Sequence, residues 1–235
     1  MKTFQKVCAL VLTAATILLC TGCFGKEEKG KIQDFPQYDV LSSSFGLTEK
    51  EILTKMGWEE SQMVKLNSMG DFVTVPLEIE LAGKQFQTTY HFGYDANTLT
   101  DVYLHSSCSA DPETAAEEMV AVLRTIAPMT GVEISEDSVN AGLGISAKDL
   151  ADALTASKRE YLDHVYKFDL SDMAEESLKQ YAQQLEQTKA FESFQGRYEL
   201  FYRLQLTFYR DEQADPGDQY RIEIKLGFDK RKIDQ

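Results

Sequence analysis

The sequence predicts an α+β protein made of two tandem units, each combining helices with an antiparallel sheet, packed as one or two small domains. Apolar residues alternate with polar ones in several segments, as in strands that bury one face. A helix-start pattern occurs twice, about 98 residues apart, which indicates an internal duplication rather than chance similarity between two caps. Hydrophobic residues make up 43% of the chain, which supports a buried core and excludes a disordered polypeptide.

Residues 1–22 read as an export signal. Two lysines precede the apolar stretch Val7–Cys20, which is shorter than the ~20 residues needed to span a bilayer as a helix. Small residues then lead into a cysteine, in the order Leu19-Cys20-Thr21-Gly22-Cys23.

This segment resembles the lipobox of bacterial lipoproteins, in which Gly or Ala precedes the lipidated cysteine, although Cys20 departs from the usual Leu or Val. The resemblance implies that the signal is removed and that Cys23 carries fatty acyl chains such as palmitate. Several chains together anchor stably, so we expect a protein tethered to the extracytoplasmic face of a cell membrane. The alternative is an ordinary signal peptide that is cut elsewhere and leaves Cys23 as a thiol.

Residues 23–40 are expected to form a flexible tether, because the stretch after Cys23 is short, charged and glycine-containing. With Cys23 lipidated and the signal cysteines removed, Cys108 has no cysteine to pair with, so the fold must hold without disulfides. The formal net charge of -14 disfavours binding to nucleic acid or to bare anionic lipid.

The first unit, residues 41–130, begins with a helix capped by Thr48 and Glu51 in a capping box. Alternation then predicts a hairpin that turns at Ala82-Gly83, pairs Ile79 with Phe86 and Val75 with Tyr90, and has Pro76 on an edge strand. A third strand follows, with Leu99, Val102 and Leu104 apolar. Asp111-Pro112 then opens a helix that we expect to end at Pro128 and Gly131.

The second unit, residues 131–235, repeats this plan with longer elements. Ser146 and Asp149 stand where Thr48 and Glu51 stand in the first unit. We expect a strand over 161–170, a helix from Asp172 to about Ala190, and a final hairpin over 198–208 and 220–228, joined at Asp215-Pro216-Gly217.

The pattern from Gly46-Leu47-Thr48 through Met56-Gly57 to Phe92-Gly93-Tyr94-Asp95 resembles the β-lactamase-inhibitor-like modules and the small outer-membrane-assembly lipoproteins. The resemblance covers about sixty residues of the first unit and mainly the helix start of the second. It implies non-enzymatic tandem modules that bind other proteins. No binding residue can be carried over by position, and the second copy lacks the glycine of the first.

Catalytic and metal-binding patterns are weak throughout. His91 and His105 fall on the polar side of neighbouring strands, about two pairs apart, with Asp101 opposite His91, which gives one weak candidate for a metal or acid–base cluster. His164 is expected to be a half-buried structural residue, and Cys108 a buried, unreactive thiol near His105. Trp58 fits either a binding face or a core position. An acidic loop lacks the ligand spacing of a calcium site: Asp211, Glu212, Asp215 and Asp218.

These observations predict a membrane-anchored, non-catalytic binding or scaffolding lipoprotein that contacts another envelope protein or peptide, with no cofactor and no metal. The alternative is a small-ligand or signal-sensing lipoprotein that assists a membrane transporter or sensor. An enzyme, such as a hydrolase, would require Cys108 or a histidine to meet acidic groups in a cleft.

Overall fold

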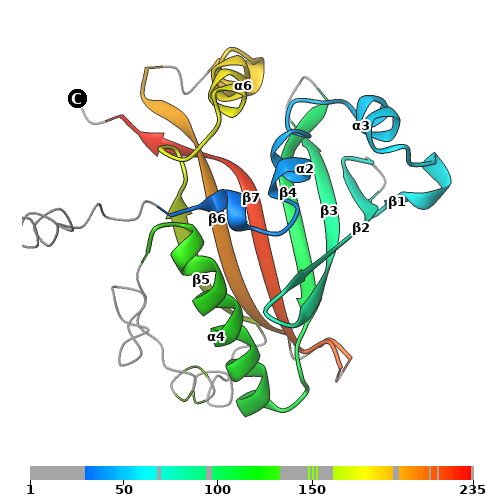
Figure 1. The fold of residues 1–235 in the computed structure, drawn as a ribbon, viewed down its shortest axis with the longest axis vertical. Coiled ribbons are helices and arrows are strands. Elements are labelled where there is room, and N and C mark those ends of the chain that lie inside the picture. The colour runs from blue at the N-terminus through cyan, green and yellow to red at the C-terminus, as the bar shows by residue number, and fades with distance from the viewer. Residues whose placement is uncertain are drawn as a thin grey trace, which may run out of the picture.

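The protein is a mixed α+β fold, and its described residues form one antiparallel sheet of seven strands, in the order β1-β2-β3-β4-β7-β6-β5 (Figure 1). The computed structural model describes residues 30–67, 70–93, 97–132, 148, 150, 152, 161–192, 196–211, 213–215 and 217–233. The strands are β1 (Val64–Lys65), β2 (Phe72–Leu81), β3 (Lys84–Gly93), β4 (Thr98–Ser107), β5 (Tyr161–Asp169), β6 (Tyr198–Asp211) and β7 (Tyr220–Lys232). The helices are η1 (Ile32–Asp34), α2 (Tyr38–Ser42), α3 (Glu49–Met56), η2 (Glu60–Gln62), α4 (Pro112–Met129), α6 (Glu176–Glu186) and α7 (Lys189–Glu192).

The first helix start is confirmed in detail. The Thr48 side chain accepts a hydrogen bond from the backbone N–H of Glu51, and the Glu51 carboxylate accepts one from the backbone N–H of Thr48. This capping box satisfies amide groups that the first turn of α3 leaves without partners. Gly57 ends the helix in the left-handed conformation, with φ of 66°, which a residue with a Cβ rarely adopts.

The β2–β3 hairpin has the expected turn but a different register at its far end. Ala82 and Gly83 both have positive φ, and Ile79 pairs with Phe86 as predicted. The expected pairing of Val75 with Tyr90 is wrong, because the register shifts between Val75 and Glu78 and Val75 pairs with Thr88. Pro76 lies inside this irregularity. Because proline has no backbone N–H to donate to a neighbouring strand, a bulge at this position sacrifices no hydrogen bond from that residue.

Helix α4 begins at the predicted cap and ends between Pro128 and Gly131, as expected. The Asp111 side chain accepts from the backbone N–H of Thr114, and Pro112 occupies the first turn. Its buried face includes Ala116, Met119, Val120, Leu123 and Ile126. The helix continues through Pro128 to Met129 and ends at Thr130, before Gly131.

In the second half, β5 and the β6–β7 hairpin are confirmed, whereas the helix after β5 is shorter than predicted. Helix α6 begins at Glu176 instead of Asp172, because the chain first turns after β5, where Asp169 accepts hydrogen bonds from Ser171. The expected cap at Ser146 and Asp149 lies outside the described residues. Lys148, Leu150 and Asp152 are helical, and Leu150 is fully buried.

The two expected units meet within the sheet, where β4 pairs with β7 from Asp101–Gly227 to Ser107–Arg221. One hydrophobic cluster contains residues from both halves. The segment expected to be a tether joins this cluster from Ile32 onward, since Ile32, Phe35 and Tyr38 are at most 1% exposed. Among the described residues, no helix is both long and apolar enough to cross a bilayer.

Helices gather on one side of the sheet, which we call the inner face. Helices α2 and α4 lie in front of the strands in Figure 1. Phe45, which follows α2, packs edge-on against Tyr202 and Phe228, and Tyr181 of α6 packs against Phe228 as well. Alternation places the apolar strand residues on this face, among them Val73, Tyr90, Val102, Leu104, Tyr166, Phe168, Leu204, Leu206, Phe208, Ile222, Ile224 and Leu226.

Candidate functional site

The polar and charged side chains of the sheet lie on its opposite side, which we call the open face. Because successive side chains of a strand point to opposite faces, the residues between the inner-face positions all point to this side. They form a mixed set of aromatic, charged and amide side chains: Phe72, Thr74, Thr89, His91, Asp101, Tyr103, His105, Arg203, Gln205, Thr207, Tyr209, Glu223 and Lys225.

A buried ionic cluster lies where β4 meets β7. The Asp101 carboxylate is 2.9 Å from Nδ1 of His91 on β3 and 2.8 Å from Nζ of Lys225 on β7. Its side chain is only 4% exposed, and Oγ1 of Thr100 lies 3.0 Å from the same carboxylate. One acidic group therefore connects three strands from both halves of the chain.

Two strand glycines make room for this cluster. A Cβ at Gly227 would lie 2.3 Å from the Asp101 carboxylate oxygen, closer than any real contact. A Cβ at Gly93 would lie 2.9 Å from the His91 ring and from Oγ1 of Thr100. Glycine inside a strand weakens it, so its presence beside the carboxylate indicates that close packing around Asp101 outweighs that loss.

The charges of the cluster stabilise each other. Burial alone would raise the pKa of the Asp101 carboxyl, but the hydrogen bond to His91 and the positive charge of Lys225 outweigh it and lower that pKa. Burial opposes the charged form of Lys225 too, and the negative charge of Asp101 more than compensates, so the pKa of Lys225 is raised. Around neutral pH the pair is therefore fully ionised.

Aromatic rings surround the cluster. Phe72 stacks on His91 with ring centroids 4.2 Å apart, and Phe72 lies 5.9 Å from Tyr103. The Lys225 ammonium lies 5.4 Å from the centroid of Tyr103, at cation–π distance. Rings and charges thus restrain one another, which favours a rigid surface over a mobile one.

A second polar group lies further along the same strands, around Glu223. The Tyr209 hydroxyl donates to Glu223 over 2.9 Å, and Nδ1 of His105 lies 3.5 Å from the other carboxylate oxygen. Burial and nearby Arg221 lower the pKa of His105 against the opposing effect of Glu223, so this imidazole is neutral at pH 7. Two recesses, of about 420 and 250 Å³, share His105 and Arg221 in their linings.

The structure brings together some of the predicted candidates and separates others. His91 faces Asp101, and His105 stands two same-face positions along, as predicted. Cys108 is buried, and burial raises the pKa of its thiol to about 12, so it is not a reactive thiolate. Trp58 packs against the core beside Tyr90. Cys23 lies outside the described residues, and so does the side chain of His164.

The acidic loop is used for turn structure. Asp211 accepts from the backbone of Gln213, and Asp218 accepts from the Ser107 hydroxyl and pairs with Arg221. Glu212 lies outside the described residues. Within the described part of the chain, no group of three or more His, Cys, Asp or Glu residues is arranged to hold a metal ion.

Sequence reasoning did not single out Lys225 or Gly227 as members of this site. A signal was present: Gly227 interrupts the large residues of an otherwise regular strand, which marks a close approach. The missing information was the pairing of β4 with β7, which are separated by more than a hundred residues in the sequence.

Comparison with protein-family models, with curated proteins and with solved structures finds no match for this chain.

Proposed function

We propose that this chain is a lipid-anchored, extracytoplasmic lipoprotein that binds another envelope protein or peptide without catalysis, using the open face of its sheet. The observation that carries the proposal is the asymmetry of the sheet. The described helices gather on the inner face, while aromatic rings and ionised side chains gather on the other. Aromatic and arginine side chains held in place are characteristic of surfaces that bind proteins.

The anchor rests on the lipobox at Leu19–Cys23. The core begins at Ile32, so only a short segment would separate a lipid on Cys23 from the folded part. At up to ~3.6 Å per residue, the seven residue steps from Cys23 to Gly30 can extend at most about 25 Å. A lipid on Cys23 would therefore keep the domain within about that distance of the membrane.

The proposal includes an origin by duplication. Apart from the two-residue β1, each half contributes three strands, and in both halves these strands follow the chain from the edge of the sheet to its centre, as β2-β3-β4 and as β5-β6-β7. Such an order is what two copies related by an approximate two-fold axis between β4 and β7 would produce. Helices α6 and α7 would then be an insertion in the second copy, between β5 and β6.

The arrangement of the polar groups favours binding over proton transfer. Asp101 is held by His91 and Lys225, and Glu223 is held by Tyr209 and His105. Groups fixed in this way present a preorganised pattern of charge and hydrogen bonding, which reduces the entropy lost when a partner binds.

Two experiments test the two parts of the proposal. Mass spectrometry of the protein from its native membrane should find acyl chains on Cys23, and Cys23→Ser should release the protein from the membrane fraction; an unacylated thiol would overturn the anchor. For binding, a photo-crosslinking amino acid at Tyr103 should capture one stoichiometric envelope protein. The same amino acid at Lys50, exposed on α3, is the matched control, and equal capture at both positions would refute the open face as the binding surface.

A second function, sensing of a small polar ligand, is favoured by the recesses around His105. Their volumes, about 420 and 250 Å³, approach or fall within the range of small-molecule sites, and their linings include Arg221, Glu223 and Tyr209. In a thermal-shift screen of solutes, a ligand of this site should raise the melting temperature of the parent protein but not of the Arg221→Ala variant. A shift of equal size in both would exclude these recesses.

A further inference from the structure

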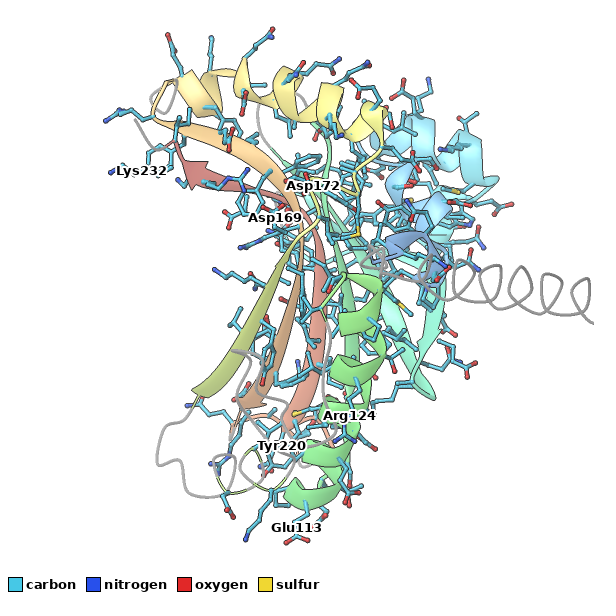
Figure 2. The ribbon with its side chains drawn as sticks, turned by 60° about the vertical axis from the view of Figure 1, so that its left-hand side comes forward. Glu113, Arg124, Asp169, Asp172, Tyr220 and Lys232 are labelled. Carbon is cyan, nitrogen blue, oxygen red and sulfur yellow. The ribbon has the colours of Figure 1, made fainter. Side chains whose placement is uncertain are left out.

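The two edges of the sheet differ in how they are protected against pairing with another strand. At one edge, β1 has two residues, and the neighbouring β2 contains Pro76 and a register shift. At the other edge, β5 pairs with β6 without interruption from Tyr161–Asp211 to Asp169–Arg203 and contains neither proline nor glycine. In the described part of the chain, no element lies beyond β5, which forms the outer side of the sheet in Figure 2.

A long, regular edge strand presents a row of backbone N–H and C=O groups to a further strand. Short strands, prolines and bulges are the usual means of preventing such pairing, and they occur at the β1–β2 edge only. Val165, at the middle of β5, is 41% exposed and is one of four exposed large hydrophobic residues in the described chain. The β5 edge therefore has the backbone regularity and the central apolar residue that strand pairing needs.

The sequence of β5 is complementary to itself when two copies run antiparallel about Val165. In that register Val165 stands opposite Val165 of the second copy, and position 163, an aspartate, stands opposite Lys167, twice by symmetry. All these positions fall on the open-face side of the strand, since they alternate with the buried Tyr166 and Phe168. Opposite charges at facing positions stabilise a pair of strands, and like charges destabilise it.

Other arrangements of two β5 strands lose this complementarity. A parallel, in-register pair would place like charges side by side. Two antiparallel registers differ from this one by a shift of two residues and keep the open-face positions of both strands on the same side. In one of them Asp163 stands opposite Asp169, which places two like charges together. The other leaves Asp163 opposite Val165. A slip that mixes the faces would bring buried positions to the outside.

We propose that β5 pairs antiparallel with β5 of a second copy of this chain, centred on Val165, to form a two-fold symmetric dimer with one continuous sheet. Because the two-fold axis is perpendicular to the sheet, both open faces lie on the same side. The inference does not depend on the anchor or on the proposed binding function. Anchoring of both copies to one membrane would raise their effective concentration and strengthen the dimer.

Charge exchange gives the sharpest test. The full-length protein in detergent micelles is studied by sedimentation equilibrium as the parent and as two single variants, Asp163→Lys and Lys167→Asp. Each single variant turns both cross-strand pairs into like-charge pairs, so its homodimer should dissociate at least about tenfold more readily than the parent. Facing positions on β6 are Tyr209 and Gln205, which are neutral, so the fold of the monomer should be kept, as circular dichroism would show.

Mixing the two single variants should restore dimerisation, because one chain then carries lysines and the other aspartates at both positions. The double variant, with the two charges exchanged in one chain, should dimerise like the parent. A parent protein that stays monomeric at all concentrations would overturn the proposal. So would single variants that dimerise like the parent, or a mixture that does not form the heterodimer.

Cross-linking tests the register in the native membrane. Cα atoms of facing residues lie within the range that a disulfide spans, so Val165→Cys should give a covalent dimer on mild oxidation. The matched control is Val64→Cys on β1, which is 58% exposed and should remain uncross-linked. A disulfide joining the two introduced cysteines supports the pairing. Equal cross-linking at both edges, or a cross-link from β5 to a different protein, refutes it.

Discussion

The two faces of the sheet are made by the same strands but serve different purposes. On β6, Leu204, Leu206 and Phe208 are fully buried against the core, whereas Arg203, Gln205 and Thr207 form a hydrogen-bonded row on the other side. Burial of large apolar side chains provides most of the stability of a domain of this size. The open face adds polar groups that satisfy one another, so its chemistry can vary without removing the core.

The two faces also join the halves of the chain in different ways. The inner face joins them through apolar contact, which depends little on direction. The open face joins them through Asp101 and Lys225, which require defined distances and charges. The first contact stabilises the fold, and the second specifies which strands of the two halves meet and in which register.

The largest predicted difference between the faces comes from neighbouring residues of β6. Phe208→Ala removes a fully buried ring and should lower the free energy of unfolding by about 3–5 kcal/mol. Tyr209→Ala removes a half-buried ring and a hydrogen bond to Glu223, and should lower it by about 1 kcal/mol. Urea denaturation of both variants measures the two values; equal losses would contradict the division of roles between the faces.

Breaking the ionic cluster should have the next largest effect. Asp101→Asn leaves Lys225 buried without its counter-charge and should lower the free energy of unfolding by about 2–4 kcal/mol at pH 7. Because the folded-state pKa of Asp101 is depressed, its contribution is present above its ordinary pKa of 3.8 and is lost as the pH falls through the folded-state value.

The pKa of Lys225 is raised instead, so its contribution is present below its ordinary value of 10.5 and is lost as the pH rises through the folded-state value. The loss caused by Asp101→Asn should therefore be constant across the neutral range and should shrink in acid. Denaturation midpoints measured from pH 3 to pH 8 test this. A loss that does not change with pH would mean that the charge of Asp101 contributes nothing.

Adding a methyl group at Gly227 tests whether the space beside the Asp101 carboxylate is needed. Gly227→Ala places a methyl group 2.3 Å from the carboxylate oxygen and should lower the free energy of unfolding by about 1–3 kcal/mol. Gly217→Ala, in the β6–β7 loop with nothing within 4 Å, is the matched control and should change it by less than about 0.5 kcal/mol. In the Asp101→Ala background the effect of Gly227→Ala should decrease, since the clashing oxygen is gone.

Much of the inner face could be predicted from the sequence, because its determinants are local. Period-2 alternation located β3, β4, β6 and β7, and the caps at Thr48 and Asp111 located two helices. The errors were at Val75 and Asp172, where a bulge and a side-chain-stabilised turn displaced elements by a few residues. Such shifts depend on tertiary contacts that periodicity does not contain.

The open face could be predicted only within one hairpin. His91 and Asp101 lie ten residues apart, and the turn between their strands fixes their pairing. Lys225 reaches the same carboxylate only because β4 and β7 are neighbours, which no local pattern specifies. The same applies to the burial of Ile32 and Phe35, since a short polar segment does not show that the residues after it join a distant core.

The smallest predicted effect is a gain in stability, at the centre of the open face. Gln205 stands opposite Lys225 on one side and Lys167 on the other, with Arg203 bonded to its side-chain oxygen. Gln205→Glu keeps the shape of the side chain and adds a negative charge among three positive ones. It should raise the free energy of unfolding by roughly 0.3–1 kcal/mol at low salt.

The gain should disappear below about pH 4, where the new carboxylate is protonated, and should decrease in high salt, which screens exposed charges. Gln205→Ala is the comparison variant, and it should lose about 0.5–1.5 kcal/mol because Arg203 and Thr207 each lose a hydrogen-bond partner. Urea denaturation at two salt concentrations distinguishes these outcomes. If the glutamate variant were less stable than the parent, the prediction would be wrong. Asp101 would then already neutralise the positive charge around Gln205, and a further carboxylate would gain no attraction from Lys167, Arg203 and Lys225.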